Sequence, residues 1–232
     1  MRYRRKWYTK LMMAVLTGLA LLWTLMPVYI IVSNSVRRTL EMKEMPPKLL
    51  FAPTWTHFEK VLTLDRFGQY FLNSVIITGS VVLLTILAGS LAAYGLKICK
   101  SKIGRNISNV LLLGKMVPVV TIMIPLFIMF NRVHITGLHL APILAHCCLT
   151  LPFVTWLMNS FISEIPGELI EAATVMGCSR LMVFPRIILP LLKPAVASAA
   201  ILVMQSSWNE LLFALTLTGI KTYPLTVGIA KY

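Results

Sequence analysis

A short polar segment interrupts the apolar sequence at residues 164–194, EIPGELIEAATVMGCSRLMVFPRIILPLLKP. It holds three glutamates, three cations and the adjacent small residues Ala172 and Ala173. Small side chains let another surface approach the backbone closely, and a carboxylate beside them can bind polar groups of that surface. The segment could therefore dock a protein partner, although composition alone favours an ordinary amphipathic loop.

The local sequence predicts a helix, a turn and a second helix within this segment. We expect Ser163 to cap the first helix, with Pro166 in its first turn, where the missing N–H is harmless. Glu168 then lies near the positive end of the helix dipole. Gly177 suits the end of the first helix, and Ser179 can cap the second.

The composition is that of an integral membrane protein. Of the 232 residues, 57% are hydrophobic and 13% are charged, and the mean hydropathy is +0.79. A soluble domain carries about 25% charged residues. The net charge of +14 could suggest nucleic acid, but the cations form short clusters beside apolar runs, so membrane orientation explains them better. We expect an all-α, polytopic membrane protein that forms a single transmembrane domain over residues 1–232.

Five apolar stretches are long enough to span a bilayer as helices. The second is rich in Gly, Ser and Ala, which predicts tight packing against other helices. Pro118 and Pro125 predict kinks or breaks in the third. The expected spans are residues 11–32, about 71–96, about 110–130, about 140–162 and about 189–218. Residues 33–70 should form an outer loop with a short surface helix near residues 55–62.

Clusters of cations set the expected orientation. When five spans alternate, the N-terminal cluster, the segment between spans two and three, and residues 164–194 all fall on one side. The positive-inside rule places that side in the cytoplasm, and with it the N-terminus. These cations are Arg2, Arg4, Arg5, Lys6, Lys10, Lys97, Lys100, Lys102, Arg105, Arg180, Arg186 and Lys193.

The spacing of the polar segment resembles the EAA motif of ABC importer permeases, EAA-x3-G-x9-I-x-LP. Each specified position is matched, and Met176 stands where the family often has Asp. The matching residues are Glu171, Ala172, Ala173, Gly177, Ile187, Leu189 and Pro190. The resemblance covers the whole chain and is to the binding-protein-dependent, sugar-importing branch (MalG-like). Its weaker marks are Asn73-Ser74, Ala93-Tyr94-Gly95, Pro118, Pro125, Leu151-Pro152-Phe153 and Trp208-Asn209-Glu210.

The resemblance implies the type I ABC importer permease fold in a bacterial or archaeal cell membrane. In that family the EAA loop docks into a groove on a cytoplasmic ATPase, and closure of the ATPase dimer switches the pore between inward- and outward-facing states. Carried over, Glu171, Ala172, Ala173 and Gly177 would dock, while Ile187, Leu189 and Pro190 would fix the loop to the next span. The implied partners are a second permease, two ATPase subunits, an extracellular substrate-binding protein and membrane lipid.

No catalytic site is expected in the chain. The sequence holds no Walker-type Gly-Lys-Ser/Thr loop, so ATP would be used by the partner ATPase, and no cofactor or metal is expected here. Cys147 and Cys148 are interpreted as packing residues. The histidines share no ligand spacing and are interpreted as structural: His57, His134, His139 and His146.

A second polar run, Gln205 to Glu210, lies inside the fifth expected span. Polar side chains within a membrane tend to face a cavity or a neighbouring helix. One hypothesis is that Gln205, Trp208, Asn209 and Glu210 line a translocation path, where Trp can stack on a sugar ring. The alternative, to which the sequence gives slightly more weight, is contact between helices or with the second permease.

The resemblance also implies a sixth span, and the chain stops at LTVGIAKY, where the outer loop before it is expected. Truncation is therefore expected. The leading interpretation is a permease subunit that translocates a sugar or sugar derivative. The alternatives are a permease for another small solute, a truncated subunit that transports nothing, and an ion-driven transporter, which inverted repeats and intramembrane acids would favour.

Overall fold

The computed structural model describes residues 7–42, 51–63, 66–98, 110–111 and 113–231, which form two compact units divided after Arg66. The described residues are helices and connecting loops, with one isolated β-bridge between Gly137 and Thr218. The expectation of an all-α chain is confirmed. A single transmembrane domain over residues 1–232 stays a prediction.

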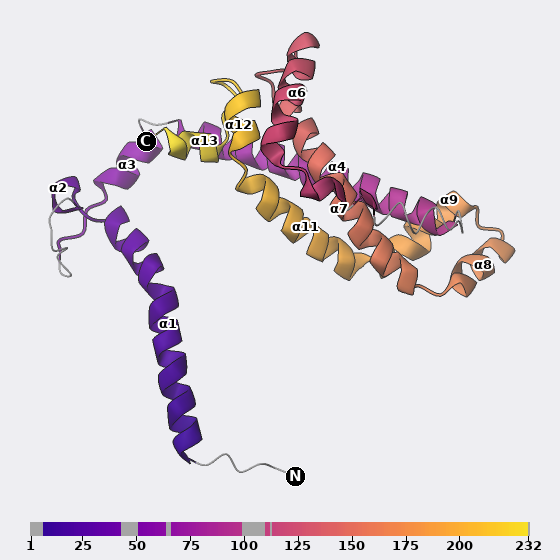
Figure 1. Ribbon diagram of the computed structural model, residues 1–232, viewed down its shortest axis with the longest axis horizontal. Helices are drawn as coiled ribbons and strands as arrows, with labels where there is room; N and C mark the ends of the chain where they lie inside the picture. Colours follow the sequence, from indigo (N-terminus) through magenta and orange to yellow (C-terminus); the bar gives the residue numbers. More distant parts are fainter. Residues whose placement is uncertain (1–6, 43–50, 64–65, 99–109, 112, 232) are drawn as a thin grey trace. The chain divides into compact units, whose positions relative to one another are not determined.

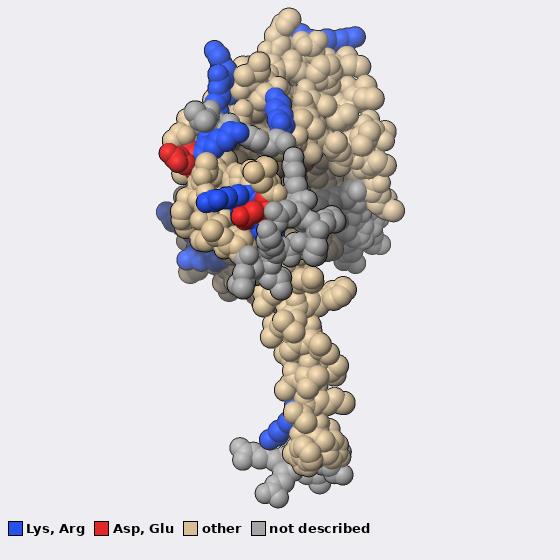
Figure 2. Space-filling model, turned by 90° about the vertical axis from the view of Figure 1, so that its left-hand side faces the viewer, with Lys and Arg blue, Asp and Glu red and all other residues tan. Residues whose placement is uncertain are grey.

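The first unit contains one long apolar helix, α1 (Trp7–Ser35), followed by α2 (Thr39–Met42) and α3 (Thr56–Thr63). The surface of α1 is uncharged along most of its length, with blue side-chain atoms only near its N-terminal end (Figure 2). Its 29 residues and high hydropathy are sufficient to cross a bilayer. The expected surface helix near residues 55–62 is present as α3.

Hydrogen bonds join α3 and the segment before it to the end of α1 within this unit. The His57 ring nitrogen Nε2 lies 2.9 Å from the Arg37 carbonyl oxygen, and the Thr54 N–H donates to the Val36 carbonyl at 2.8 Å. Residues 51–63, which belong to the outer loop expected over residues 33–70, are therefore held to the residues after α1; residues 43–50 and 64–65 lie outside the described residues.

The second unit is built on α4 (Phe67–Ile98), α7 (Leu140–Glu164) and α11 (Lys193–Trp208), which pack against one another (Figure 1). Small residues make this contact close, as predicted for the second span: a Cβ on Gly89 would lie 2.8 Å from Val154 Cγ1. Thr85 and Ser90 donate their hydroxyls to carbonyls one turn earlier in α4, which satisfies these polar groups in an apolar setting.

Two separate apolar clusters fill this unit. The first joins α4, α7 and α11 to the segment after α7 and includes Val81, Val154 and Met158. The second is formed by α6 (Val119–Arg132), the first half of α7 and α12 (Leu212–Leu217). Its buried members are Phe130, Ala141, Ala145, Phe213 and Leu217.

Hydrogen bonds from Asn73 tie the start of α4 to the C-terminal segment. Its Nδ2 donates to the carbonyls of Lys221 and Tyr223 at 3.0 and 2.9 Å, and its Oδ1 lies 2.8 Å from His139 Nε2. The next residue, Ser74, accepts from the N–H of Leu225 at the start of α13 (Leu225–Ala230). The Asn73-Ser74 pair therefore holds three segments together.

The five expected spans correspond to helices that differ in length. By length and composition, α1, α4 and α7 can each cross a membrane, and the pair 180–191 and 193–208, bent by 77°, would be a fourth span if it crosses as one. The third expected span corresponds to α6, which has 14 residues, begins after Pro118 and contains Pro125. The fifth is divided, because α11 ends at Trp208 and α12 begins at Leu212.

Candidate functional site

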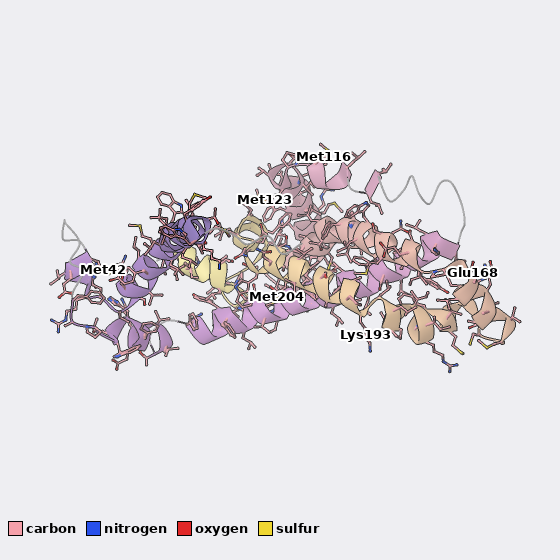
Figure 3. All side chains as sticks on the ribbon, turned by 90° about the horizontal axis from the view of Figure 1, so that it is seen from below. Met42, Met116, Met123, Glu168, Lys193 and Met204 are labelled. Carbon is pink, nitrogen blue, oxygen red and sulfur yellow. The ribbon has the colours of Figure 1, made fainter. Side chains whose placement is uncertain are left out.

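The segment after α7 folds as the predicted helix, turn and helix. The first helix is α8 (Gly167–Val175), with Glu168 in its first turn, and the second is α9 (Arg180–Val183). A π-helical turn (Phe184–Ile188) and α10 (Leu189–Leu191) connect α9 to α11. Figure 3 shows Glu168 beyond Lys193, so the segment extends past the first turn of α11. We call residues 166–183 the α8–α9 loop.

A tight turn at Gly177 joins the two helices. Its φ of +90° is in the left-handed region that glycine adopts without strain, as the sequence predicted. The Gly177 and Cys178 N–H groups donate to the Thr174 and Ala173 carbonyls, each at 3.0 Å, which satisfies the end of α8.

Of the two predicted helix caps, the one at Ser179 is present, and the prediction for Ser163 is wrong. Ser179 accepts a hydrogen bond from the Met182 N–H, as predicted for the cap of α9. Ser163 instead lies in the last turn of α7 and donates to the Asn159 carbonyl, because α7 continues to Glu164. The residue before α8 is Pro166, which has no capping side chain.

The C-terminal end of α4 supports the α8–α9 loop. Lys97 donates to the carbonyls of Ser163 and Ile165, at 3.3 and 3.1 Å, where a cation complements the end of α7. The Tyr94 hydroxyl donates to the Arg180 carbonyl at 2.7 Å, and its ring lies against that of Phe184, with centroids 5.3 Å apart. The sequence had marked Tyr94 only as part of Ala93-Tyr94-Gly95.

The predicted docking residues lie on two different faces of the loop. Glu171, Ala172 and Gly177 are exposed, whereas Ala173 is 1% exposed and packs in the first apolar cluster. Ile187 and Leu189 are half-buried against the same cluster, and Pro190 is exposed. The second alanine therefore holds α8 on the protein, and the first faces outward.

Exposed apolar side chains surround the Gly177 turn, which the sequence analysis did not predict. Val175 is 88% exposed, Met176 78% and Leu181 83%. Beside them, between α8, α9 and the end of α4, lies a hollow of about 310 Å³ lined by Lys97, Glu171 and Arg180 among others. The exposed face thus combines apolar side chains, a carboxylate and cations, a combination typical of protein-binding surfaces.

Of the cations used for orientation, Lys10, Lys97, Arg180, Arg186 and Lys193 are among the described residues. The others lie outside them: Arg2, Arg4, Arg5, Lys6, Lys100, Lys102 and Arg105.

The four candidate path residues do not share one environment. Gln205 and Asn209 are exposed, and Asn209 donates to the Gln205 carbonyl at 2.9 Å. Trp208 is half-buried and lies edge-on against Phe71 of α4, with ring centroids 5.8 Å apart. Glu210 turns inward, where its Oε2 lies 3.4 Å from His146 Nε2. Within the described residues, no three potential metal ligands come together.

Comparison with known proteins identifies relatives among transport permeases. Residues 85–231 match the family model described as "binding-protein-dependent transport system inner membrane component". A probable ABC transporter permease of Sinorhizobium fredii is 33% identical over 85% of this chain and 75% of its own length. A melibiose/raffinose/stachyose import permease of Bacillus subtilis is 32% identical over 89% of this chain and 75% of its own.

Another relative is the trehalose/maltose transport system permease of Thermococcus litoralis, 35% identical over 80% of this chain and 68% of its own. Among solved structures, a chain of a bacterial ABC transporter that imports alginate superposes with a TM-score of 0.84. It is 22% identical, and the match covers all of this chain and 82% of that one. At 22% identity, this likeness shows that the two chains share a fold.

Proposed function

Since this chain belongs to the family of binding-protein-dependent transport system inner membrane components, we propose that it carries a sugar or sugar derivative across the membrane. The solute class is supported by relatives named for melibiose, raffinose and stachyose, for trehalose and maltose, and for diacetylchitobiose. The chain is a membrane-embedded permease. Its working partners are a second permease, two ATPase subunits and an extracellular binding protein.

The α8–α9 loop is the proposed site at which an ATPase subunit docks. The observation that supports it is the exposed apolar group around Gly177, carried on a loop whose opposite side is fixed to the core by Ala173, Val183 and Phe184. Apolar side chains so exposed on a loop are typical of surfaces that a partner covers. A loop fixed on one side and covered on the other can transmit movement of the partner into the membrane-embedded helices.

Each EAA residue takes a defined part in this proposal. Glu171, Ala172 and Gly177 form the contact with the ATPase, together with the apolar side chains beside them. Ala173, Ile187, Leu189 and Pro190 set the position of the loop on the membrane-embedded core. Met176, which replaces the acid common in the family, makes this contact more apolar.

The orientation follows from the same proposal. The α8–α9 loop and Lys97 lie together, at the ends of α4 and α7. An ATPase is cytoplasmic, so this end of the unit faces the cytoplasm. The N-terminus is placed there too, by the positive-inside rule applied to its cations.

The role of Gln205, Trp208 and Asn209 in the translocation path is also a proposal. Gln205 and Trp208, three residues apart, share one face of α11, and Asn209 follows the end of the helix and bonds to the Gln205 carbonyl. We place that face toward the solute or toward the second permease. Their substitution should change the rate or the selectivity of uptake of the solutes that the binding protein delivers. Unchanged uptake and selectivity would remove the path role.

Co-purification with the ATPase tests the docking site. Leu181→Asp should reduce recovery of the ATPase with the tagged permease, because a charge replaces an apolar contact. Leu40→Asp in α2 is a matched control, since Leu40 is also 83% exposed and lies in the expected outer loop. Equal recovery with both variants would rule out the docking role. If the unsubstituted permease recovers the ATPase fully but supports no uptake, it is a subunit that assembles but does not transport.

A further inference from the structure

The break between α11 and α12 separates the two apolar clusters of the second unit. Ala195, Ala199 and Val203 of α11 are buried in the first cluster, which also contains Ala173 of the α8–α9 loop. Phe213 and Leu217 of α12 are buried in the second cluster with α6 and the first half of α7. Residues 209–211 connect α11 to α12 along the chain, and α7 contributes side chains to both clusters.

Glu210 makes the contacts that bridge this break. Its carboxylate accepts hydrogen bonds from the N–H groups of Phe213, at 3.0 Å, and Ala214, at 3.2 Å, so it caps α12. The same carboxylate lies 3.4 Å from Nε2 of His146, in the first half of α7. The Glu210 carbonyl accepts from the Thr226 hydroxyl of α13 at 3.1 Å.

The surroundings of this contact are closed. His146 is 4% exposed, and its ring lies edge-on against Phe213, with centroids 5.7 Å apart. A void of only about 10 Å³ remains among the side chains around Glu210 and His146, about enough for one water molecule. The carboxylate therefore does not face a space that a sugar could enter. A buried polar group such as the His146 ring is costly without a partner, so the contact resists separation.

We propose that Glu210 and His146 form a latch that ties the start of α12 to α7, so that α12 and α13 move with the helices of the first cluster. Both are positioning residues, which act through the helices and not on the solute. The inference rests on the proposed function, because the movement would enter at the α8–α9 loop. With the latch intact, displacement of that loop shifts the first cluster, and the latch transmits the shift to the second. Without it, the loop still moves with the ATPase but α12 does not follow.

Cysteine reporters in the assembled complex test this. In a background with the four native cysteines changed to serine, Leu215→Cys reports on α12 and Leu169→Cys on α8; both leucines are exposed. Their rates of reaction with a methanethiosulfonate reagent are compared in nucleotide-free complex and after trapping with ATP and vanadate. We expect trapping to change both rates by about fivefold, the lower range for coupled sites. Glu210→Leu and His146→Leu, which remove the polar atoms of the contact, should each abolish the change at Leu215→Cys and keep it at Leu169→Cys.

Ser206→Ala is the control, since Ser206 is an exposed neighbour on α11 and should keep both responses. An unaltered response at Leu215→Cys in the Glu210 and His146 variants would overturn the latch, as would the absence of that response in the parent complex. If Glu210→Leu fails to assemble, His146→Leu decides. Failure of both to assemble would show a role in folding instead of a latch. Absence of the ATPase from the parent complex, or no response at Leu169→Cys, would overturn the proposed function itself.

Discussion

The hydroxyl of Tyr94 donates a hydrogen bond of 2.7 Å to the backbone carbonyl of Arg180. This bond joins the C-terminal end of α4 to the start of α9, so the α8–α9 loop is held by a helix that precedes it by some eighty residues in sequence. Because the acceptor is a backbone atom, the contact does not depend on the side chain at position 180. It fixes the position of the loop relative to the core.

Tyr94→Phe removes that bond and keeps the ring that packs on Phe184. We expect a loss of stability of about 1 kcal/mol, the usual net value of one hydrogen bond. The measurement is the temperature at which half of the detergent-solubilised permease remains monodisperse. Tyr29→Phe, on the exposed surface of α1, should leave this temperature unchanged. An equal shift in both variants would contradict the supporting role of Tyr94.

The adjacent alanines of the EAA motif should respond in opposite ways. Ala173→Leu places three extra carbons in a packed site, and overpacking of this kind costs about 1–3 kcal/mol. Ala172→Leu should leave stability unchanged but reduce recovery of the ATPase, because Ala172 faces outward. Thermal stability and co-purification of both variants check this. A stable Ala173→Leu variant would show that α8 is not held as the structure describes.

Gly177→Ala should weaken the turn between α8 and α9. An L-residue in the left-handed region costs about 1–2 kcal/mol, and the φ of +90° lies in that region. Since no other atom lies within 4 Å of the position a Cβ would take, the cost comes from the backbone alone. Gly18→Ala, inside α1, is the control and should be neutral or slightly stabilising. Recovery of the ATPase should fall only for Gly177→Ala.

Gly89→Ala should push α4 away from α7. The added Cβ would lie 2.8 Å from Val154 Cγ1 and 3.2 Å from the backbone nitrogen of Thr155, so the helices must separate, at about 1–3 kcal/mol. Gly79→Ala on the same helix meets nothing within 4 Å and should be tolerated. Adding Val154→Ala should recover part of the loss, and strict additivity of the two substitutions would contradict direct contact.

Much of this architecture could be predicted because its signals are local. Apolar length predicted the helices, and the small residues of α4 predicted its close packing with α7. Gly177 and Ser179 predicted a turn and a cap, since each acts on neighbouring backbone groups. The cap assigned to Ser163 was wrong because α7 continues to Glu164, two residues beyond the expected end, and local sequence does not encode that extension.

The features that escaped prediction depend on contacts between distant segments. The EAA spacing did not indicate that Ala173 is buried while Ala172 is exposed, because that depends on where α9 returns to the core. The bonds from Tyr94 to Arg180 and from Glu210 to His146 join residues far apart in the chain. In the sequence Glu210 belonged with Trp208 and Asn209, yet the break after α11 turns its side chain the other way.

The 77° bend between residues 180–191 and 193–208 makes this part of the chain an angled lever with its pivot at the bend. One arm is the segment fixed to the α8–α9 loop, and the other is α11, whose 16 residues extend about 24 Å. A rotation of about 10° at the elbow would displace the far end of α11 by about 4 Å, calculated from the rise of a helix. A push across the first arm would thus become a sideways displacement of the far end of α11, and the length of α11 sets the size of that displacement.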